Sequence, residues 1–117
     1  MKKHNKTIGF LGESMACSYL EKNGYQILEK NWGNKWGEID IIAKVGQTIV
    51  YVEVKTKTGQ NYGRPEQMVN PRKLRQIERM ASVYSAGINA PKRIDVIAVL
   101  LTRDKKLQSI NHYQAVY

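Results

Sequence analysis

The sequence predicts a single α/β domain in which helices flank a mixed central sheet, with the element order αβββαββ. Three observations lead to this prediction. Apolar residues recur at helical spacing in two separate segments of the chain. Between these segments, apolar and polar residues alternate with the period of two that is typical of strands. A chain of 117 residues is also long enough for one hydrophobic core and too short for two.

Both predicted helices carry an apolar stripe and end at a glycine. The first spans residues 7–23 and is followed by Gly24. The second begins with Asn70 as its N-cap and has a proline in its first turn. Its apolar stripe continues to about Ala86, and Gly87 ends the helix.

A hairpin is predicted in the middle of the chain. Residues 38–45 and residues 47–57 both alternate in polarity, and Gly46 lies in the turn between them. A short strand over residues 25–30 precedes this hairpin. Because residues 31–37 are rich in Asn and Gly, we expect them to form a loop.

Two further strands are predicted near the C-terminal end. Residues 94–101 form the most apolar run of the chain, which is typical of a buried strand. A last strand is expected over residues 107–113. By contrast, residues 58–65 contain Gly, Asn and Pro, and they are expected to form an exposed loop.

Composition excludes several classes of protein. Hydrophobic residues make up 42% of the chain and charged residues 25%, which is ordinary globular usage and not that of a disordered chain. No apolar run has the length of a membrane span, and the polar start lacks the apolar segment of a secretory signal. Cys17 is the only cysteine, so no intramolecular disulfide and no cysteine zinc cluster is expected. These features predict a cytoplasmic protein.

Positive charge is concentrated between residues 55 and 79. This window holds seven basic and two acidic residues, and thus five of the nine net positive charges. Such a cluster attracts the phosphates of a nucleic acid, which is the partner we expect. A solvated helix face remains an alternative, while an anionic membrane is less consistent because no second apolar face is apparent. The candidate nucleic-acid contacts are Lys57, Arg64, Arg72, Lys73, Arg75 and Arg79.

Two carboxylates and a lysine occupy one face of the predicted hairpin. Glu53 and Lys55 point the same way on one strand, about 6.6 Å apart by strand rise. Asp40 lies in an apolar stretch of the partner strand, where an unpaired acid is costly to bury. Paired carboxylates suit a hard divalent cation such as Mg²⁺, and a nearby lysine can orient a water or stabilise a phosphate. A solvent-facing strand edge is the alternative for Glu53 and Lys55 taken alone.

The residues of this hairpin resemble a known pair of motifs. Gly37-Glu38-Ile39-Asp40-Ile41-Ile42, followed by Val52-Glu53-Val54-Lys55-Thr56, is similar to the core motif of the PD-(D/E)xK nuclease superfamily. More specifically, it resembles the small YraN-type family of bacterial proteins. The resemblance extends over nearly the whole chain and implies a restriction-endonuclease-like domain spanning residues 1–117.

The resemblance also implies a chemistry and a set of site residues. Asp40 and Glu53 would be ligands of Mg²⁺ or Mn²⁺, Val54 would offer its backbone carbonyl to the same ion, and Lys55 would be the catalytic lysine. Glu13 matches an acid that some members of the superfamily place in the first helix. The implied reaction is metal-dependent hydrolysis of phosphodiester bonds, with DNA favoured over RNA and branched DNA as a candidate substrate. A homodimer is expected by analogy only.

Two other classes of function are compatible with the sequence. One is a nuclease-like module that binds nucleic acid as an adaptor without cutting it, and the other is a basic protein-interaction domain. Periodicity does not decide whether Lys73 and Gln76 face the site or solvent. Asp95 is interpreted as a structural hydrogen-bond partner in preference to a residue that supports the metal ligands, and His112 is interpreted as a surface residue.

Overall fold

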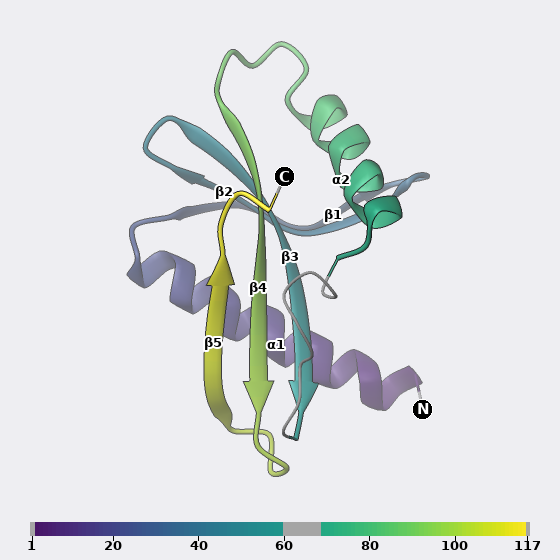
Figure 1. The fold of residues 1–117 in the computed structure, drawn as a ribbon, viewed down its shortest axis with the longest axis vertical. Coiled ribbons are helices and arrows are strands. Elements are labelled where there is room, and N and C mark those ends of the chain that lie inside the picture. The colour runs from purple at the N-terminus through teal and green to yellow at the C-terminus, as the bar shows by residue number, and fades with distance from the viewer. Residues whose placement is uncertain (1, 60–68, 117) are drawn as a thin grey trace.

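The helices and strands of the described chain follow one another in the order αβββαββ, which confirms the predicted fold class (Figure 1). The computed structural model describes residues 2–59 and 69–116, with side chains from residue 7 onward. The elements are α1 (Lys2–Lys22), β1 (Gln26–Asn34), β2 (Gly37–Val45), β3 (Thr48–Thr58), α2 (Pro71–Tyr84), β4 (Lys92–Leu101) and β5 (Leu107–Tyr113).

The strands form one mixed sheet in the spatial order β1-β2-β3-β4-β5. Among the strands of the described residues, β3 and β4 run parallel and the other neighbouring pairs are antiparallel. Parallel neighbours require a crossover connection, and α2 lies in that connection between β3 and β4. The β1–β2 hairpin runs across the long axis of β3 and β4, so one end of the sheet is strongly twisted (Figure 1).

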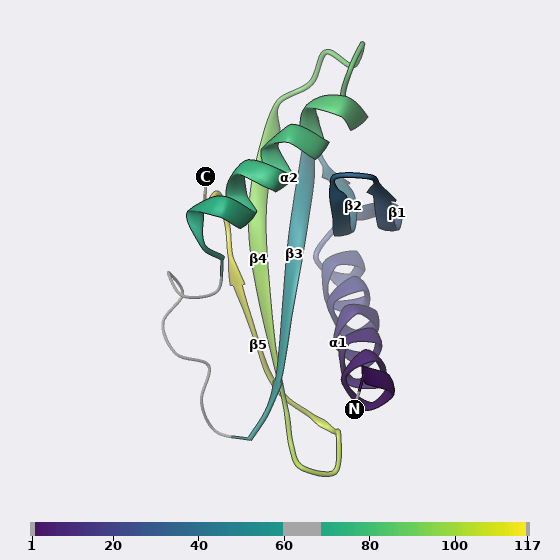
Figure 2. The ribbon, with the colours of Figure 1, turned by 90° about the vertical axis from the view of Figure 1, so that its right-hand side faces the viewer.

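The two helices cover opposite faces of the sheet (Figure 2). Alternation along β3 divides its side chains between them: Val50 and Val52 face α1, whereas Ile49 and Tyr51 face α2. Neither of the two described helices has the apolar length needed to cross a membrane. The α1 side of the core is completed by Ala16, Leu20, Ile41, Ile97 and Leu101, and the α2 side by Ile42, Ile77, Met80 and Ile94.

The prediction of a loop at residues 31–37 is wrong for residues 31–34, which belong to β1. β1 continues to Asn34, and a tight turn then leads directly into β2. The cause is Trp32, whose side chain packs on the α2 side of the core and meets the ring of Tyr84 edge-on at 5.2 Å. Burial of this large aromatic outweighs the turn preference of the neighbouring Asn and Gly residues.

The alternation predicted for residues 38–45 holds only in part. It places Ile39 and Ile41 on one face, with Ile42 among the polar side chains of the other. In the structure all three are buried, and Ile39 joins Ile42 on the α2 side while Ile41 faces α1. The strand therefore rotates about its axis near residue 40, at the point where its pairing with β3 ends.

Two helix ends also differ from the predicted ones. α1 begins at Lys2 and not at Thr7, and α2 ends at Tyr84 and not near Ala86. The first residues of α1 are polar, so they extend the helix without adding to the apolar stripe from which it was predicted.

Asp95 on β4 is fully buried and organises a polar network, in agreement with its structural interpretation. Arg93 donates two hydrogen bonds of 2.8 Å to its carboxylate, and the backbone N–H of Ala115 donates a third. His112 Nε2 lies 2.7 Å from the same carboxylate, and its side chain is only 6% exposed, so its prediction as a surface residue is wrong. Burial by itself raises the pKa of Asp95, but the bonds from His112 and Arg93 bring that pKa below its usual value.

Helix α1 lies close to β3 at Gly12. A side-chain carbon at this position would overlap the side chain of Thr56. The backbones can come this close only because residue 12 has no side chain, and the same approach brings α1 beside the strand that carries Glu53 and Lys55. Gly9, one turn earlier, has open space around it.

This difference predicts opposite effects of one added methyl group at two glycines of the same helix. Gly12→Ala should lower the free energy of unfolding by about 1–3 kcal/mol, because Thr56 or the helix must move. Gly9→Ala should raise it by about 0.5–1 kcal/mol, since alanine favours the helix and meets no neighbour. Urea unfolding followed by circular dichroism measures both. Equal effects at the two positions would contradict the close approach of α1 to β3.

Candidate active site

The candidate site begins where β2 and β3 separate. Their pairing ends at Ile41 opposite Val52, and Asp40 is the next residue on β2. Its carboxylate accepts a 2.8 Å hydrogen bond from the backbone N–H of Val54. A side chain of β2 thus takes the place of a backbone partner for β3, which keeps Asp40 beside the gap between the strands.

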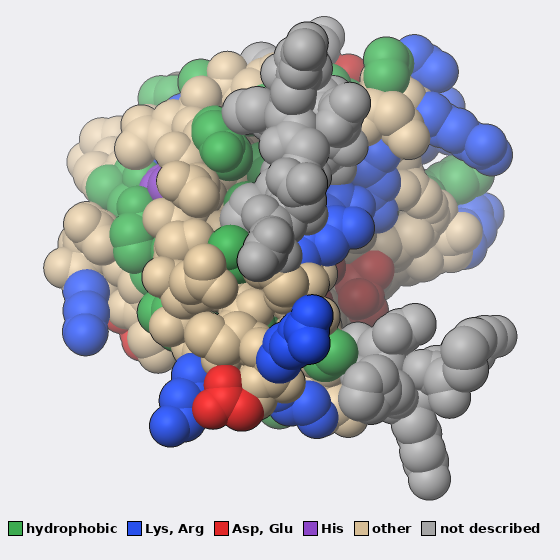
Figure 3. Space-filling model, turned by 60° about the horizontal axis from the view of Figure 1, so that its bottom comes forward, with side chains coloured by type: hydrophobic (Ala, Val, Ile, Leu, Met, Phe, Trp, Pro, Cys, Tyr) green, Lys and Arg blue, Asp and Glu red, His purple; other side chains and the backbone are tan. Residues whose placement is uncertain are grey.

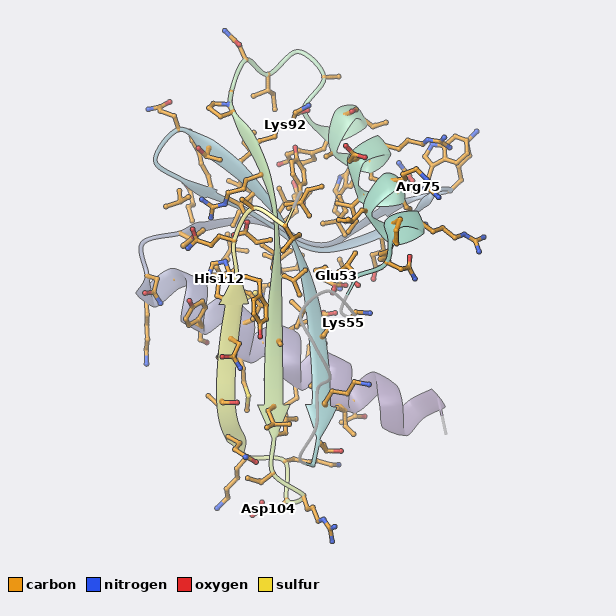
Figure 4. The ribbon with its side chains drawn as sticks, in the orientation of Figure 1. Glu53, Lys55, Arg75, Lys92, Asp104 and His112 are labelled. Atoms are coloured by element: carbon orange, nitrogen blue, oxygen red, sulfur yellow. The ribbon has the colours of Figure 1, made fainter. Side chains whose placement is uncertain are left out.

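An open pocket of about 470 Å³ lies at this gap. Glu13 of α1, Asp40 of β2, and Glu53 and Lys55 of β3 all line it. Figure 4 shows Glu53 and Lys55 close together along β3. The structure therefore brings to one place the carboxylates and the lysine that the sequence predicts as a group. The remaining lining residues are Ile8, Gly9, Val54, Thr56, Lys57 and Thr58.

Burial and mutual repulsion make simultaneous ionisation of Asp40 and Glu53 unfavourable. Burial, followed by the charge of Glu53, raises the pKa of Asp40 to about 7. Burial likewise raises the pKa of Glu53, although nearby Lys73 and Lys55 oppose the shift. Without an added cation, full ionisation of both carboxylates near neutral pH is therefore unfavourable.

The two oxygens of Glu53 have different surroundings. Oε2 lies 3.7 Å from the Nζ of Lys55 and 4.0 Å from the Nζ of Lys73. Oε1 is buried and has no hydrogen-bond partner among the described residues. A buried carboxylate oxygen without a partner is costly, so Oε1 is a free acceptor position beside Asp40.

Glu13 reaches the same pocket from α1. Asn31 of β1 donates a 2.9 Å hydrogen bond to its carboxylate and so orients it. Burial raises the pKa of Glu13, and the charge of Asp40 adds to the rise although the bond from Asn31 opposes it. Asn31 has a φ of +48°, which Asn tolerates better than most residues. The acid predicted in the first helix is therefore near Asp40, and it is partly buried.

The residues present suit a hard divalent cation. Mg²⁺ needs oxygen ligands, commonly takes one or two carboxylates from a protein and keeps several waters, and this pocket is open to solvent. Asp40 and Glu53 supply the carboxylates, and the unpartnered Oε1 of Glu53 is an available ligand atom. The described residues contain no cluster of three or more His, Cys, Asp or Glu arranged to hold a metal, so water and backbone oxygens would have to complete the shell.

Lys73 is the residue whose place the sequence left open. Asn70 caps α2 by accepting a hydrogen bond from the backbone N–H of Lys73, which fixes this residue in the first turn. The side chain then points toward Glu53 and not away from the protein. A signal did exist, because Lys73 lies four residues before Ile77 and so extends the buried stripe of α2 toward its N-terminal end.

Of the other predicted nucleic-acid contacts that the structure describes, Lys57 lines the pocket and the three arginines do not. Arg72, Arg75 and Arg79 are exposed on α2, and Lys57 is exposed at the far end of the pocket. Figure 3 shows acidic side chains in a recess, with Lys and Arg side chains along one rim. Arg64, with most of the predicted loop at residues 58–65, lies outside the described residues.

Comparison with known proteins identifies the family. Residues 12–99 match the uncharacterised protein family UPF0102. The chain belongs to the UPF0102 family. A UPF0102 protein of Caldanaerobacter subterraneus is 47% identical over 117 aligned residues, which cover 96% of each chain. UPF0102 proteins of Alkaliphilus metalliredigens and Geobacter metallireducens are 45% and 44% identical, covering 92% and 96% of this chain and 97% and 93% of their own. The YraN-type assignment is thus confirmed, while membership of the nuclease superfamily stays a prediction.

The raised pKa of Asp40 predicts a pH-dependent loss of stability in the absence of metal. An acid whose pKa is higher in the folded protein stabilises the fold at low pH, and this contribution is lost as the pH rises from about 4 through 7. Asp40→Asn keeps an oxygen for the N–H of Val54 and removes the charge. In EDTA it should therefore be more stable than the wild type by about 1–3 kcal/mol at pH 8, and by much less at pH 5.

Urea unfolding at the two pH values measures this difference. Glu21→Gln, which removes an exposed carboxylate near the C-terminal end of α1, is the matched control and should change stability little at either pH. If the free energies of unfolding of the wild type and of Asp40→Asn differ by the same amount at pH 5 and at pH 8, the raised pKa of Asp40 is ruled out.

Proposed function

We propose that this protein is a metal-dependent nuclease that hydrolyses phosphodiester bonds in nucleic acid, with DNA favoured over RNA. The observation that carries the proposal is the pair formed by Asp40 and Glu53. These carboxylates come from strands that separate at this point, both have raised pKa values, and Glu53 has a buried oxygen without a partner. Such a pair is poorly suited to a purely structural role and well suited to hold a divalent cation.

Each charged residue of the pocket has a part in the proposed reaction. A divalent cation on Asp40 and Glu53 would lower the pKa of a bound water and neutralise charge on the phosphate. Lys55, whose side chain is 38% exposed, can reach into the open pocket to orient the attacking water or to stabilise the phosphate oxygens. Glu13, held by Asn31, can accept a proton or orient a second water on the α1 side.

The basic surface supports nucleic acid as the substrate. Arg72 and Arg75 are exposed near the end of α2 that carries Lys73, and Lys57 is exposed at the outer end of the pocket. Phosphates bound along these side chains would pass over the carboxylates, and binding should weaken as salt increases. The same proposal includes branched DNA as a candidate substrate, assembly as a homodimer and a cytoplasmic location.

One observation favours the alternative of a binding module without cleavage activity. Glu53 already has two ammonium groups near Oε2, so part of the negative charge of the pocket is compensated without any metal. A protein of this kind would bind nucleic acid through Arg72 and Arg75 and leave it intact. It would show salt-sensitive binding that charge reversal on α2 abolishes, and no product with any metal.

Cleavage assays separate the two functions. Plasmid, single-stranded DNA, branched DNA and RNA are incubated with the protein in Mg²⁺ or Mn²⁺. Glu53→Gln and Lys55→Met should each reduce the rate at least about 100-fold, since each removes a group that acts on the metal or the phosphate. Lys44→Met, an exposed lysine at the other end of β2, is the matched control and should cut like the wild type. Undiminished metal-dependent cleavage by Glu53→Gln would refute the proposed site.

Direct metal binding gives a second test that needs no substrate. Lys73 and a divalent cation compete for Glu53, so Lys73→Met should tighten Mn²⁺ binding about threefold to tenfold. Glu53→Gln should weaken it by at least about tenfold. Isothermal titration calorimetry or the electron paramagnetic resonance of free Mn²⁺ measures the dissociation constants. Unchanged Mn²⁺ affinity in both variants would place the cation elsewhere.

A further inference from the structure

A tryptophan at the tip of the β1–β2 hairpin is left on the surface among positive charges. Trp36 is 43% exposed. The Nζ of Lys35 lies 5.0 Å from the centroid of its ring, and the guanidinium carbon of Arg79 lies over the same ring at 5.2 Å. The other tryptophan of the chain, Trp32, is packed against Tyr84 in the core, so only Trp36 has no part in core packing.

The backbone around Trp36 is held in place from two sides. Its N–H donates a 2.8 Å hydrogen bond to the side chain of Asn34, and its carbonyl accepts one from the side chain of Gln76 on α2. Gly37 has a φ of +142°, and a side chain there would overlap Gln76. The hairpin tip is therefore fastened to α2, and the exposed indole is presented from a fixed backbone.

This position places the indole on the basic side of the candidate active site. Gln76 and Arg79, which contact Trp36, follow Lys73 on α2, and Lys73 contacts Glu53. Along α2 the rise from Lys73 to Arg79 is about 9 Å. Along β2 the distance from Trp36 to Asp40 is about 13 Å. Since stacked nucleotides are about 3.4 Å apart along a strand, the indole lies roughly three or four nucleotides from the carboxylates.

We propose that Trp36 is a stacking platform for an unpaired nucleobase, with Lys35 and Arg79 as contacts for the neighbouring phosphates. Both cations lie over the ring in the absence of nucleic acid, and because both side chains are exposed, they can move off it to the phosphates when a base stacks. This inference rests on the proposed nuclease function and names its substrate class: nucleic acid with a single-stranded segment beside the cleavage point. An aromatic ring among cations is the arrangement that binds single strands without regard to sequence. A base inside a duplex is covered on both faces by its neighbours, so the platform selects against fully paired DNA.

Binding measurements without metal test this substrate class separately from cleavage. Two fluorescein-labelled DNA probes are compared by anisotropy in EDTA: a blunt duplex, and the same duplex with a short single-stranded thymine tail. The wild type should bind the tailed probe about tenfold more tightly than the blunt one. Trp36→Leu should bind the tailed probe about tenfold more weakly than the wild type, with the affinity for the blunt duplex changed less than about twofold.

Control variants distinguish stacking from loss of folding or of surface area. Both hydrogen bonds at residue 36 use its backbone, so they persist in Trp36→Leu, and Trp36→Phe should retain most of the affinity for the tailed probe. Leu107→Ala removes a similarly exposed apolar side chain at the start of β5 and should bind both probes like the wild type. Tailed DNA should also quench tryptophan fluorescence in the wild type and not in Trp36→Leu.

Each possible result of these measurements either supports or overturns Trp36 as a stacking platform. A wild type that binds both probes equally, or a Trp36→Leu variant that loses affinity for both alike, overturns the platform. Absence of binding to either probe also overturns it and leaves the indole to a partner of another class, such as a protein. Selective binding of the tailed probe without cleavage in Mg²⁺ or Mn²⁺ upholds the platform while the proposed hydrolysis fails.

Discussion

The hydrogen bond from the Val54 N–H to the carboxylate of Asp40 is the interaction on which the candidate site depends. It occurs where β2 leaves β3, immediately after the pair formed by Ile41 and Val52. A buried N–H without a partner is costly, so the separation of the strands requires a side-chain acceptor at this point. Because Asp40 is that acceptor, the same carboxylate that completes the sheet is also held beside Glu53.

Charge within the pocket is balanced only in part. Lys55 and Lys73 both lie near one oxygen of Glu53, while the other oxygen is buried without a partner among the described residues. Two neighbouring buried carboxylates with raised pKa values stabilise a fold poorly, and apolar residues of similar size would do better. The arrangement is therefore best understood through what it can bind, and a divalent cation satisfies both the free oxygen and the repulsion between the acids.

Helix α2 connects the parts of the molecule to which we assign a function. Its buried stripe, which includes Ile77 and Met80, fixes the helix on the sheet. On the adjoining side of the helix, Lys73 lies beside Glu53, and Gln76 donates a hydrogen bond to the hairpin tip. One rigid element thus places Lys73 beside Glu53 and holds the hairpin tip that bears Trp36, and the spacing between these two points is about that of a few nucleotides.

The sequence by itself determined the order of the elements, the hairpin turn at Gly46 and the grouping of Asp40 with Glu53, because periodicity and turn residues are local signals. Tertiary structure decided what those signals do not contain. Packing of Trp32 on Tyr84 turned a predicted loop into strand, and rotation of β2 moved Ile39 to the other face. The sides taken by Lys73 and Trp36 depend on how α2 crosses the sheet, and the burial of His112 depends on contact with Asp95. Such contacts join residues far apart in the chain, so no local pattern encodes them.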